Sequence, residues 1–296
     1  MKNIIQLQGK TLIILLLVVS FILLVYKVGD RDLWAPDEDE YAQISREMIR
    51  TNNWVFPTVN GKPWTIKPVL YNWLVSAISL PWGDVDEFRA RIFSSLAALG
   101  TVLVTFHLCK MAFTPLAGFL GALALATNIM FLQHARWAQT YMLSTFFAVL
   151  AIYLFYRGYR AENKRTISYL LMYAAVGLGV LTMGPVNLAI PGLVIFFYLI
   201  VMKDLKHILN MRIVLGILIF SVITLPWYVL VSLKGEYGSE LLISTNILRF
   251  FTPLHHAQPF YYYFIDLPWA FFPGHFFCQA PSCSLSQNDR KMTANR

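Results

Sequence analysis

The stretch TISYLLMYAAVGLGVLTMGPVNLAIPGLVIFFYLIVM, residues 166–202, contains no Asp, Glu, Lys, Arg or His. A helix that crosses a bilayer needs about 20 mostly apolar residues, so this stretch is too long for one crossing. Gly184-Pro185 lies near its middle, and such a pair marks a turn. The stretch therefore predicts two membrane-spanning helices joined by a tight turn.

Similar apolar runs occur along most of the chain. Charge-free or nearly charge-free runs cover residues 11–26, 92–109, 111–133, 137–156, 213–233 and 260–277. The last run is the weakest, because it contains Asp266. Pro226, in the run before it, predicts a kink or a helix end. Together these runs predict an all-α, polytopic transmembrane helical bundle with about eight spans.

The composition agrees with a membrane protein and argues against other classes. The chain is 57% hydrophobic and 14% charged, whereas soluble domains are nearer half apolar and about a quarter charged. The net charge of +8 would suggest nucleic acid in a soluble protein, but here the basic residues lie between apolar runs. Cys109, Cys278 and Cys283 form no zinc-binding pattern. No small-residue cleavage site follows residues 11–26, which predicts a retained anchor.

The basic residues orient the predicted array, because loops rich in Lys and Arg stay in the cytoplasm. They fall on one side of it: Lys2, Lys10, Lys110, Arg157, Arg160, Lys164, Arg165, Lys203, Lys206 and Arg212. The amino terminus is therefore predicted to be cytoplasmic. Two long segments, residues 28–91 and 234–259, then face outward, and long loops are where function concentrates.

The first external loop opens with an acidic cluster, Asp37-Glu38-Asp39-Glu40. Tyr41 and Met48 continue it at helical spacing, which predicts an interfacial amphipathic helix over residues 37–50. Two interpretations of Asp37 stay open. It could cap the helix in an Asp37-x-x-Glu40 box, or it could be a carboxylate held at the membrane surface as a general base or ligand.

The rest of this loop contains a turn and a short apolar run. Asn60-Gly61 lies between β-prone segments and predicts a hairpin. The charge-free run at 68–83 is short for a span and predicts an interfacial or re-entrant helix. Lys67 before it could extend toward the headgroups or pair with a lipid phosphate. Arg89 and Arg91 allow the same two interpretations.

These residues, taken in order, resemble a known family. The run resembles the first periplasmic loop of bacterial dolichyl-phosphate-mannose-protein mannosyltransferase-like glycosyltransferases, and among them the aminoarabinose lipid A transferase group. The matching segments of the loop are Pro36-Asp37-Glu38, Tyr41-Ala-Gln-Ile-Ser-Arg-Glu-Met48, Trp54-Val-Phe-Pro57, Asn60-Gly61-Lys62 and Lys67-Pro68. The matching segments further on are Ala135-Arg136-Trp-Ala-Gln-Thr-Tyr141, Leu181-Thr-Met-Gly-Pro185, Pro226-Trp-Tyr228, Asn246-Ile-Leu-Arg249-Phe250, His256-Ala-Gln-Pro-Phe-Tyr-Tyr-Tyr263 and Leu267-Pro-Trp269.

The resemblance implies a fold and a reaction. Such enzymes have the GT-C membrane fold and move a sugar from a polyprenyl-phosphate donor to an extracytoplasmic acceptor, with inversion at the anomeric carbon. It implies that Asp37 is the catalytic carboxylate. It also implies a positive charge for the donor phosphate, substrate-lining side chains and a metal or phosphate ligand. The residues for these roles are Lys67, Arg136 and Arg249 for the phosphate, Glu38, Tyr41 and Tyr262 for the lining, and His256 as the ligand.

The sequence departs from the aminoarabinose transferases at four positions. Ile66 replaces a Glu that helps to bind a metal in those enzymes, Ser144 replaces an Asp, Glu40 replaces an Arg, and Met183 replaces a Lys. These changes make a divalent metal cofactor and aminoarabinose itself unsafe expectations. A related transferase, with another sugar or another lipid or protein acceptor, fits better.

The expected organisation is a transmembrane glycosyltransferase-like domain over residues 1–277 and a polar tail over residues 278–296. The tail lacks apolar periodicity and is typical of disorder, and relatives continue further, so a truncated product is expected. The alternatives are a membrane transporter and an inactive scaffold fragment. A transporter predicts ionisable groups near the middle of the spans, and the runs contain almost none. The expected location is a bacterial inner membrane, with a periplasmic active site and no nucleic-acid partner.

Overall fold

The computed structural model describes residues 2–34, 37–64, 66–161 and 165–233. The predicted eighth run at 260–277, the second external loop and the polar tail lie outside the described residues. The elements, in chain order, are α1 (Lys2–Leu24), α2 (Asp37–Thr51), β1 (Thr58–Val59), β2 (Lys62–Pro63), α3 (Leu70–Ser79), η1 (Leu80–Trp82), α4 (Glu87–Ala112), α5 (Pro115–Ala126), α6 (Ile129–Ala135), α7 (Thr140–Arg160), α8 (Arg165–Met183), α9 (Val186–Val201), η2 (Leu205–Met211) and α10 (Ile213–Ser232).

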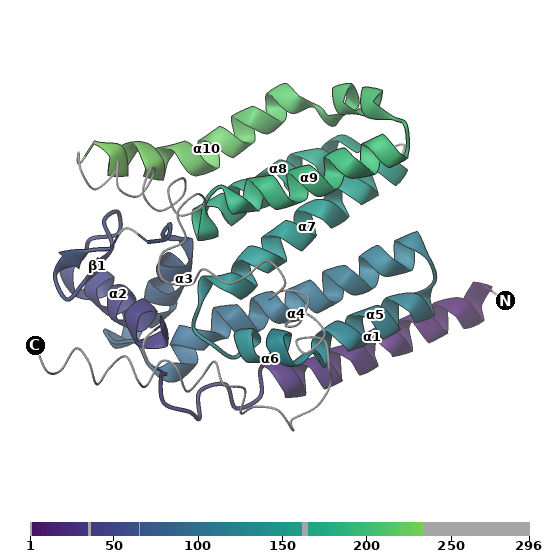
Figure 1. Ribbon diagram of the computed structural model, residues 1–296. Helices are drawn as coiled ribbons and strands as arrows, with labels where there is room; N and C mark the ends of the chain where they lie inside the picture. Colours follow the sequence, from purple (N-terminus) through teal and green to yellow (C-terminus); the bar gives the residue numbers. More distant parts are fainter. Residues whose placement is uncertain (1, 35–36, 65, 162–164, 234–296) are drawn as a thin grey trace, which may run out of the picture.

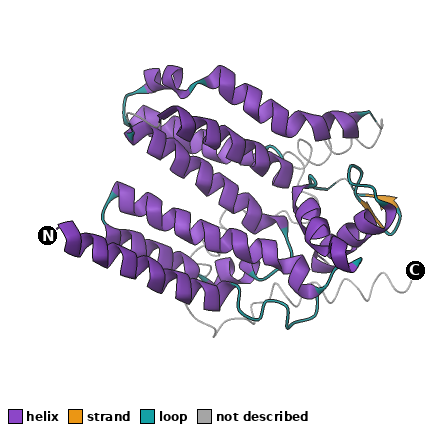
Figure 2. Ribbon diagram, turned by 180° about the vertical axis from the view of Figure 1, so that it is seen from behind, coloured by secondary structure: helices purple, strands orange, loops and turns teal. Residues whose placement is uncertain are grey.

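The long helices lie side by side in one elongated bundle, with α1 along one edge and α10 along the other (Figure 1). The elements of the first loop, α2, α3 and the β1–β2 hairpin, gather at one end of this bundle, as the view from behind also shows (Figure 2). The opposite end receives the last turns of α4 and α7, which carry Lys110, Arg157 and Arg160. The structure thus separates the acidic loop from these basic residues, as the sequence predicts.

The apolar helices identify an integral membrane protein. Among the described residues, four helices are long and apolar enough to cross a membrane: α4, α7, α8 and α10. The bent pair α5–α6 makes a fifth if it is one span, while residues 11–24 of α1 and the whole of α9 are shorter apolar helices. The outer faces of α9 and α10 expose large apolar side chains such as Phe197 and Val214, which suits contact with lipid chains. The predicted total of eight spans remains a prediction.

The predicted third run, residues 111–133, is not one straight helix. It breaks into α5 and α6, which are bent by 67°. The Asn128 side chain accepts a hydrogen bond from the Phe131 N–H at 2.9 Å and starts the second helix, while the Thr127 hydroxyl bonds back to the Leu123 carbonyl at 2.9 Å. Local side-chain bonds of this kind compete with a continuous helix. The link after α6 contacts the start of the first loop's helix, because Ala138 and Gln139 donate hydrogen bonds to Glu38 and Asp37.

The predicted turn between α8 and α9 is confirmed. Gly184 has a φ of 85°, which a residue without a Cβ adopts at little cost, and α9 starts directly after Pro185. Pro226, by contrast, does not end α10, which continues to Ser232. Elsewhere small residues allow close contact, since a Cβ added to Gly118 would lie 2.7 Å from the Phe106 carbonyl oxygen in α4. Helices in membranes commonly pack through such positions.

The first loop folds as the sequence predicts, into a helix, a hairpin and a second short helix. Asn60 and Gly61, with φ values of 53° and 73°, form the turn between β1 and β2. Tyr41 and Met48 of α2 are buried. The Trp73 indole of α3 donates to the Trp54 carbonyl at 2.6 Å. The loop is therefore a packed cap on the bundle.

The Glu47 carboxylate ties the hairpin turn to α2. It accepts hydrogen bonds from the Thr58 hydroxyl and the Asn60 N–H, each at 2.5 Å, and from the Gly61 N–H at 3.3 Å. Partial burial tends to raise the pKa of Glu47, but the bond from Thr58 and the other donors outweigh it and lower the pKa. The ionised form is thus the one that holds the turn.

Replacing Glu47 should loosen the turn without unfolding the cap. In Glu47→Gln the charge that the backbone amides face is lost, so their exchange with deuterium should become roughly 2–10-fold faster, as expected for one net hydrogen bond. Hydrogen exchange of the peptide containing residues 60–61 at pH 7 measures this. Because the pKa is lowered in the folded state, the parent keeps its protection above pH 4.5 and loses it as the pH falls further. A pH-independent difference between the two proteins would contradict the assignment.

Candidate functional site

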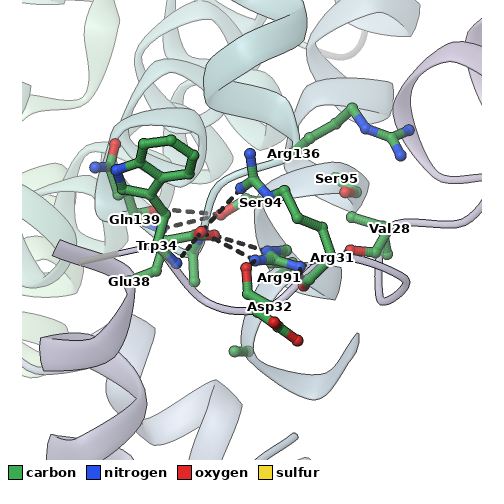
Figure 3. A network of polar contacts seen from close by, with 12 residues as sticks. Val28, Arg31, Asp32, Trp34, Glu38, Arg91, Ser94, Ser95, Arg136 and Gln139 are labelled. Carbon is green, nitrogen blue, oxygen red and sulfur yellow. Dashed lines mark hydrogen bonds and ion pairs between the residues drawn. The ribbon is translucent and has the colours of Figure 1, made fainter. Parts of the chain in front are cut away.

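A buried ion pair fixes the start of the cap on the bundle. Glu38 in α2 is 2% exposed and Arg91 in α4 is 0% exposed. The Arg91 Nε donates to Glu38 Oε1 at 2.7 Å and one terminal nitrogen donates to Oε2 at 3.0 Å, so the pair is bidentate. The Arg31 guanidinium and the Trp34 and Ala138 backbone N–H groups add three more donors to the same carboxylate (Figure 3).

The surroundings of this pair keep it charged. Burial alone raises the pKa of the Glu38 carboxyl, but the Arg91 bond and the backbone bonds from Ala138 and Trp34 hold it below its usual range. The remaining Arg91 N–H groups donate to the carbonyls of Val28, Arg31 and Asp32. Every N–H group of the Arg91 guanidinium thus donates to Glu38 or to a backbone carbonyl of this chain. The structure therefore supports a structural role for Glu38, rather than the substrate-lining role that the resemblance implies.

Arg136 has a similar structural position. Its guanidinium donates to the Leu23, Tyr26 and Lys27 carbonyls at 3.0–3.1 Å. These carbonyls lie in the last turn of α1 and just after it, where a cation is favourable. The side chain points away from Glu38 (Figure 3). A donor phosphate would have to compete with three carbonyl bonds, so the contacts support a role for Arg136 in joining α1 to the α6–α7 link.

Asp37 carries an exposed carboxylate at the start of the cap. It is the first residue of α2, where the helix dipole favours a negative charge. Its Oδ2 accepts a hydrogen bond from Gln139 Nε2 at 2.8 Å, and Gln139 belongs to the link just before α7. Within the described residues this is the hydrogen bond that the Asp37 side chain forms. The contact therefore favours an Asp37 directed at the bundle over one that caps its own helix.

Glu40, where the related enzymes have an Arg, lies close enough to Asp37 for their charges to interact. Partial burial raises the pKa of Glu40, the Trp64 side chain bonds to the carboxyl and works against this, and repulsion from Asp37 raises the pKa further. Two neighbouring carboxyl groups thus stand at the start of α2, one exposed and one half-buried.

Lys67 lies at the same end of the bundle as Asp37. Its ammonium is 6.0 Å from the centre of the Tyr141 ring, and Tyr141 is in the first turn of α7, two residues after Gln139. The two charged side chains that the resemblance assigns to the reaction therefore both lie near the start of α7, Asp37 at Gln139 and Lys67 at Tyr141. A cation beside a helix N-terminus is a suitable setting for a phosphate.

The remaining site residues fall into two groups. Tyr41 is buried, with its ring 5.6 Å from that of Trp64 and its hydroxyl 3.4 Å from Thr140 Oγ1, so it packs the cap against α7. Ser144, at a departure from the family pattern, accepts a hydrogen bond from Asn187 at 2.7 Å. Arg249, His256 and Tyr262 lie outside the described residues. Within the described residues no group of three His, Cys, Asp or Glu side chains could hold a metal ion.

Three residues of this region, Arg89, Arg91 and Gln139, have contacts that the sequence does not reveal. Arg91 is fully buried, so both interpretations of it as a headgroup anchor or lipid ligand are wrong. Arg89 instead stacks on Trp82, with 4.0 Å between the guanidinium carbon and the ring centre. Gln139, 3% exposed, carries no sequence signal of its own, because its partner Asp37 lies 102 positions earlier.

Known proteins share this architecture. The chain is 31% identical over 262 residues to an undecaprenyl phosphate-alpha-4-amino-4-deoxy-L-arabinose arabinosyl transferase from Aeromonas salmonicida, covering 84% of this chain and 47% of that protein. A protein of Aquifex aeolicus is 29% identical, with 89% and 52% covered. The crystal structure of ArnT from Cupriavidus metallidurans bound to undecaprenyl phosphate superposes with a TM-score of 0.78 at 26% identity, covering 88% of this chain and 48% of that one. The chain thus spans about half the length of these relatives.

The helical bundle with its packed cap defines a membrane protein of the GT-C class, and the structural match confirms this fold. A family model described as dolichyl-phosphate-mannose-protein mannosyltransferase matches residues 66–229, which is more than half of the chain. The chain belongs to this family. The resemblance drawn from the ordered loop motifs is thereby confirmed at the level of the family and of its aminoarabinose transferase branch.

Proposed function

We propose that this chain carries the first half of a glycosyltransferase that moves a sugar from a polyprenyl-phosphate donor to a lipid or other extracytoplasmic acceptor. The observation that carries the proposal is the exposed Asp37 carboxylate, held by Gln139 at the end of the bundle where Lys67 also lies. The relative bound to undecaprenyl phosphate supports the donor class, because its fold matches over 88% of this chain.

In the proposed reaction Asp37 accepts the proton of the acceptor nucleophile. The nucleophile forms a new bond to the anomeric carbon as the bond from that carbon to the phosphate oxygen breaks, and polyprenyl phosphate leaves. Attack opposite the leaving group inverts the anomeric centre. Lys67, together with Arg249 outside the described residues, neutralises the phosphate. No step is assigned to a metal, since Ile66 replaces the ligand of the related enzymes and His256 lies outside the described residues.

The proposed orientation places the cap in the periplasm and the amino terminus in the cytoplasm of a bacterial inner membrane. The last turns of α4 and α7 support it, because their basic residues lie at the end opposite the cap, as the positive-inside rule requires. A transporter fits less well. Among the described residues, Arg91 is the one buried Asp, Glu, Lys or Arg within a span, and it lies near the start of α4 rather than at the midplane.

The test is transfer from radiolabelled polyprenyl-phosphate sugars in washed membranes. Two forms are compared: the chain itself, and a chimera that continues it with the remaining portion of the Aeromonas salmonicida relative. That remaining portion expressed alone gives the background. Transfer above background by either form supports the proposal, and transfer by the chimera alone shows that the chain supplies the acidic cap but needs the second half. No transfer by either form at equal abundance, over pentosyl and hexosyl donors, contradicts it.

A further inference from the structure

The Gln139 side chain joins Asp37 to His134. Its Nε2 lies 2.8 Å from Asp37 Oδ2 and its Oε1 lies 3.3 Å from His134 Nδ1. The backbone of Gln139 is fixed as well, because its N–H donates to the Ser94 hydroxyl at 3.4 Å and its carbonyl accepts from that hydroxyl at 3.1 Å. A glutamine with both ends bonded and 3% exposed has one orientation available to it.

The chemistry of the two partners sets that orientation. An ionised carboxylate only accepts hydrogen bonds, so the nitrogen of the amide must face Asp37. The amide oxygen then faces His134 and requires a proton on Nδ1. The His134 ring is held in turn by edge contacts with Trp137 and Tyr141, at 5.6 and 5.3 Å between ring centres. Hydrogen bonds in such a chain polarise and strengthen one another.

We propose that Gln139, oriented by His134, is the residue that positions the Asp37 carboxylate for proton transfer. This inference depends on the proposed function, because it takes Asp37 as the reacting group. The amide holds Oδ2 and leaves Oδ1 to receive the acceptor proton. Positioning matters because a misplacement of about 1 Å costs on the order of 10²-fold in rate. Asp37 is exposed at the first residue of α2. It needs such a partner more than a buried group would, because packing does not hold an exposed side chain in place.

The variant Gln139→Leu keeps the size of the side chain and removes both bonds. In a transferring form of the protein, kcat should fall about 10–100-fold while KM for the polyprenyl-phosphate donor changes less than about 2-fold, because positioning acts on the chemical step. Gln133→Leu is the matched control: Gln133 is exposed in α6 and should tolerate the same change. A loss of the same size in both variants, or a loss confined to KM, would overturn the proposal.

Two changes at His134 test the orienting bond. Asn places an N–H near the position of Nδ1 and can still donate to Gln139, whereas Phe keeps the ring but offers no donor. His134→Asn should therefore retain about 10-fold more activity than His134→Phe. Equal activities in the two variants would show that the ring alone matters, which removes His134 from the proposal.

A chemical readout makes the contact testable even in a form that transfers no sugar. A water-soluble carbodiimide labels accessible carboxyl groups, and the Gln139 amide covers the Asp37 Oδ2 atom at 2.8 Å. In Gln139→Leu, labelling of Asp37 should rise about 3-fold or more relative to Asp39, the exposed carboxyl two residues later that serves as internal reference. An increased ratio supports the positioning role. If neither form of the protein transfers sugar, that failure counts against the proposed function alone. An unchanged ratio overturns the positioning role whatever the transfer assay shows.

Discussion

The Asp37→Asn variant is expected to transfer sugar about 10²–10⁴-fold more slowly than the parent form, the usual contribution of a general base. The amide is nearly the same size as the carboxylate but cannot take up the acceptor proton. It also loses the charge that Gln139 Nε2 faces at 2.8 Å. The measurement is the single-turnover rate with a labelled polyprenyl-phosphate donor, in whichever form of the protein transfers.

Asp39→Asn provides the control for this prediction. Asp39 is exposed, lies two residues further along α2 and undergoes the same change of charge, so its variant should keep a rate within about 2-fold of the parent, as surface substitutions usually do. Comparable losses in the two variants would show that the acidic cluster acts only through its net charge. A fully active Asp37→Asn would remove Asp37 from the reaction.

The second large effect is expected on stability, from Arg91. Replacing it with Leu leaves the Glu38 carboxylate buried without its main partner, which typically costs about 3–5 kcal/mol. Unfolding of the purified protein in mixed micelles, followed by tryptophan fluorescence as denaturing detergent is added, measures the change. Arg31→Leu is the matched control: it removes a donor from the same carboxylate, but the Arg31 side chain is 48% exposed, so its loss should stay within about 1 kcal/mol.

The double variant Glu38→Leu with Arg91→Leu separates the ion pair from simple packing. Removing both charges should recover part of the stability lost in Arg91→Leu, because no unpaired charge stays buried. In the parent, the pKa of Glu38 is held below its usual value of 4.5, so the stabilisation is complete above that value and is lost as the pH falls below it. An Arg91→Leu protein as stable as the parent would refute the assigned role.

The sequence predicts the helices and the elements of the first loop well, because both depend on local patterns. Gly184-Pro185 divides a long apolar run as expected, and Asn60-Gly61 forms the expected turn. The bend near Asn128 was not predicted. Hydropathy averages over a run of residues, whereas a single side chain that bonds to its own backbone ends a helix within one turn.

The candidate site is less predictable, because its contacts join distant parts of the chain. The acidic cluster marks Asp37 and Glu38 equally, and only the fold shows that one is exposed and the other is buried against Arg91. Likewise, an arginine near a helix start has the same local signature whether it faces headgroups or a buried carboxylate. Gln139 has no distinguishing neighbour in the sequence and is found only through its contact with Asp37.

The hydrogen bonds from Arg136 to the end of α1 have a consequence for the order in which the protein folds during synthesis. The arginine lies 109–113 positions after the carbonyls that it binds. A ribosome adds roughly 5–20 residues per second, so about 5–20 s pass between the synthesis of these carbonyls and the synthesis of Arg136. During that interval the first helix sits in the bilayer with nothing from this link to hold it. The interval between the synthesis of Glu38 and that of Arg91 is shorter, since the two residues are 53 positions apart. The cap can therefore start to close onto α4 before the Arg136 bonds fix the end of α1, because these bonds form only when the α6–α7 link emerges.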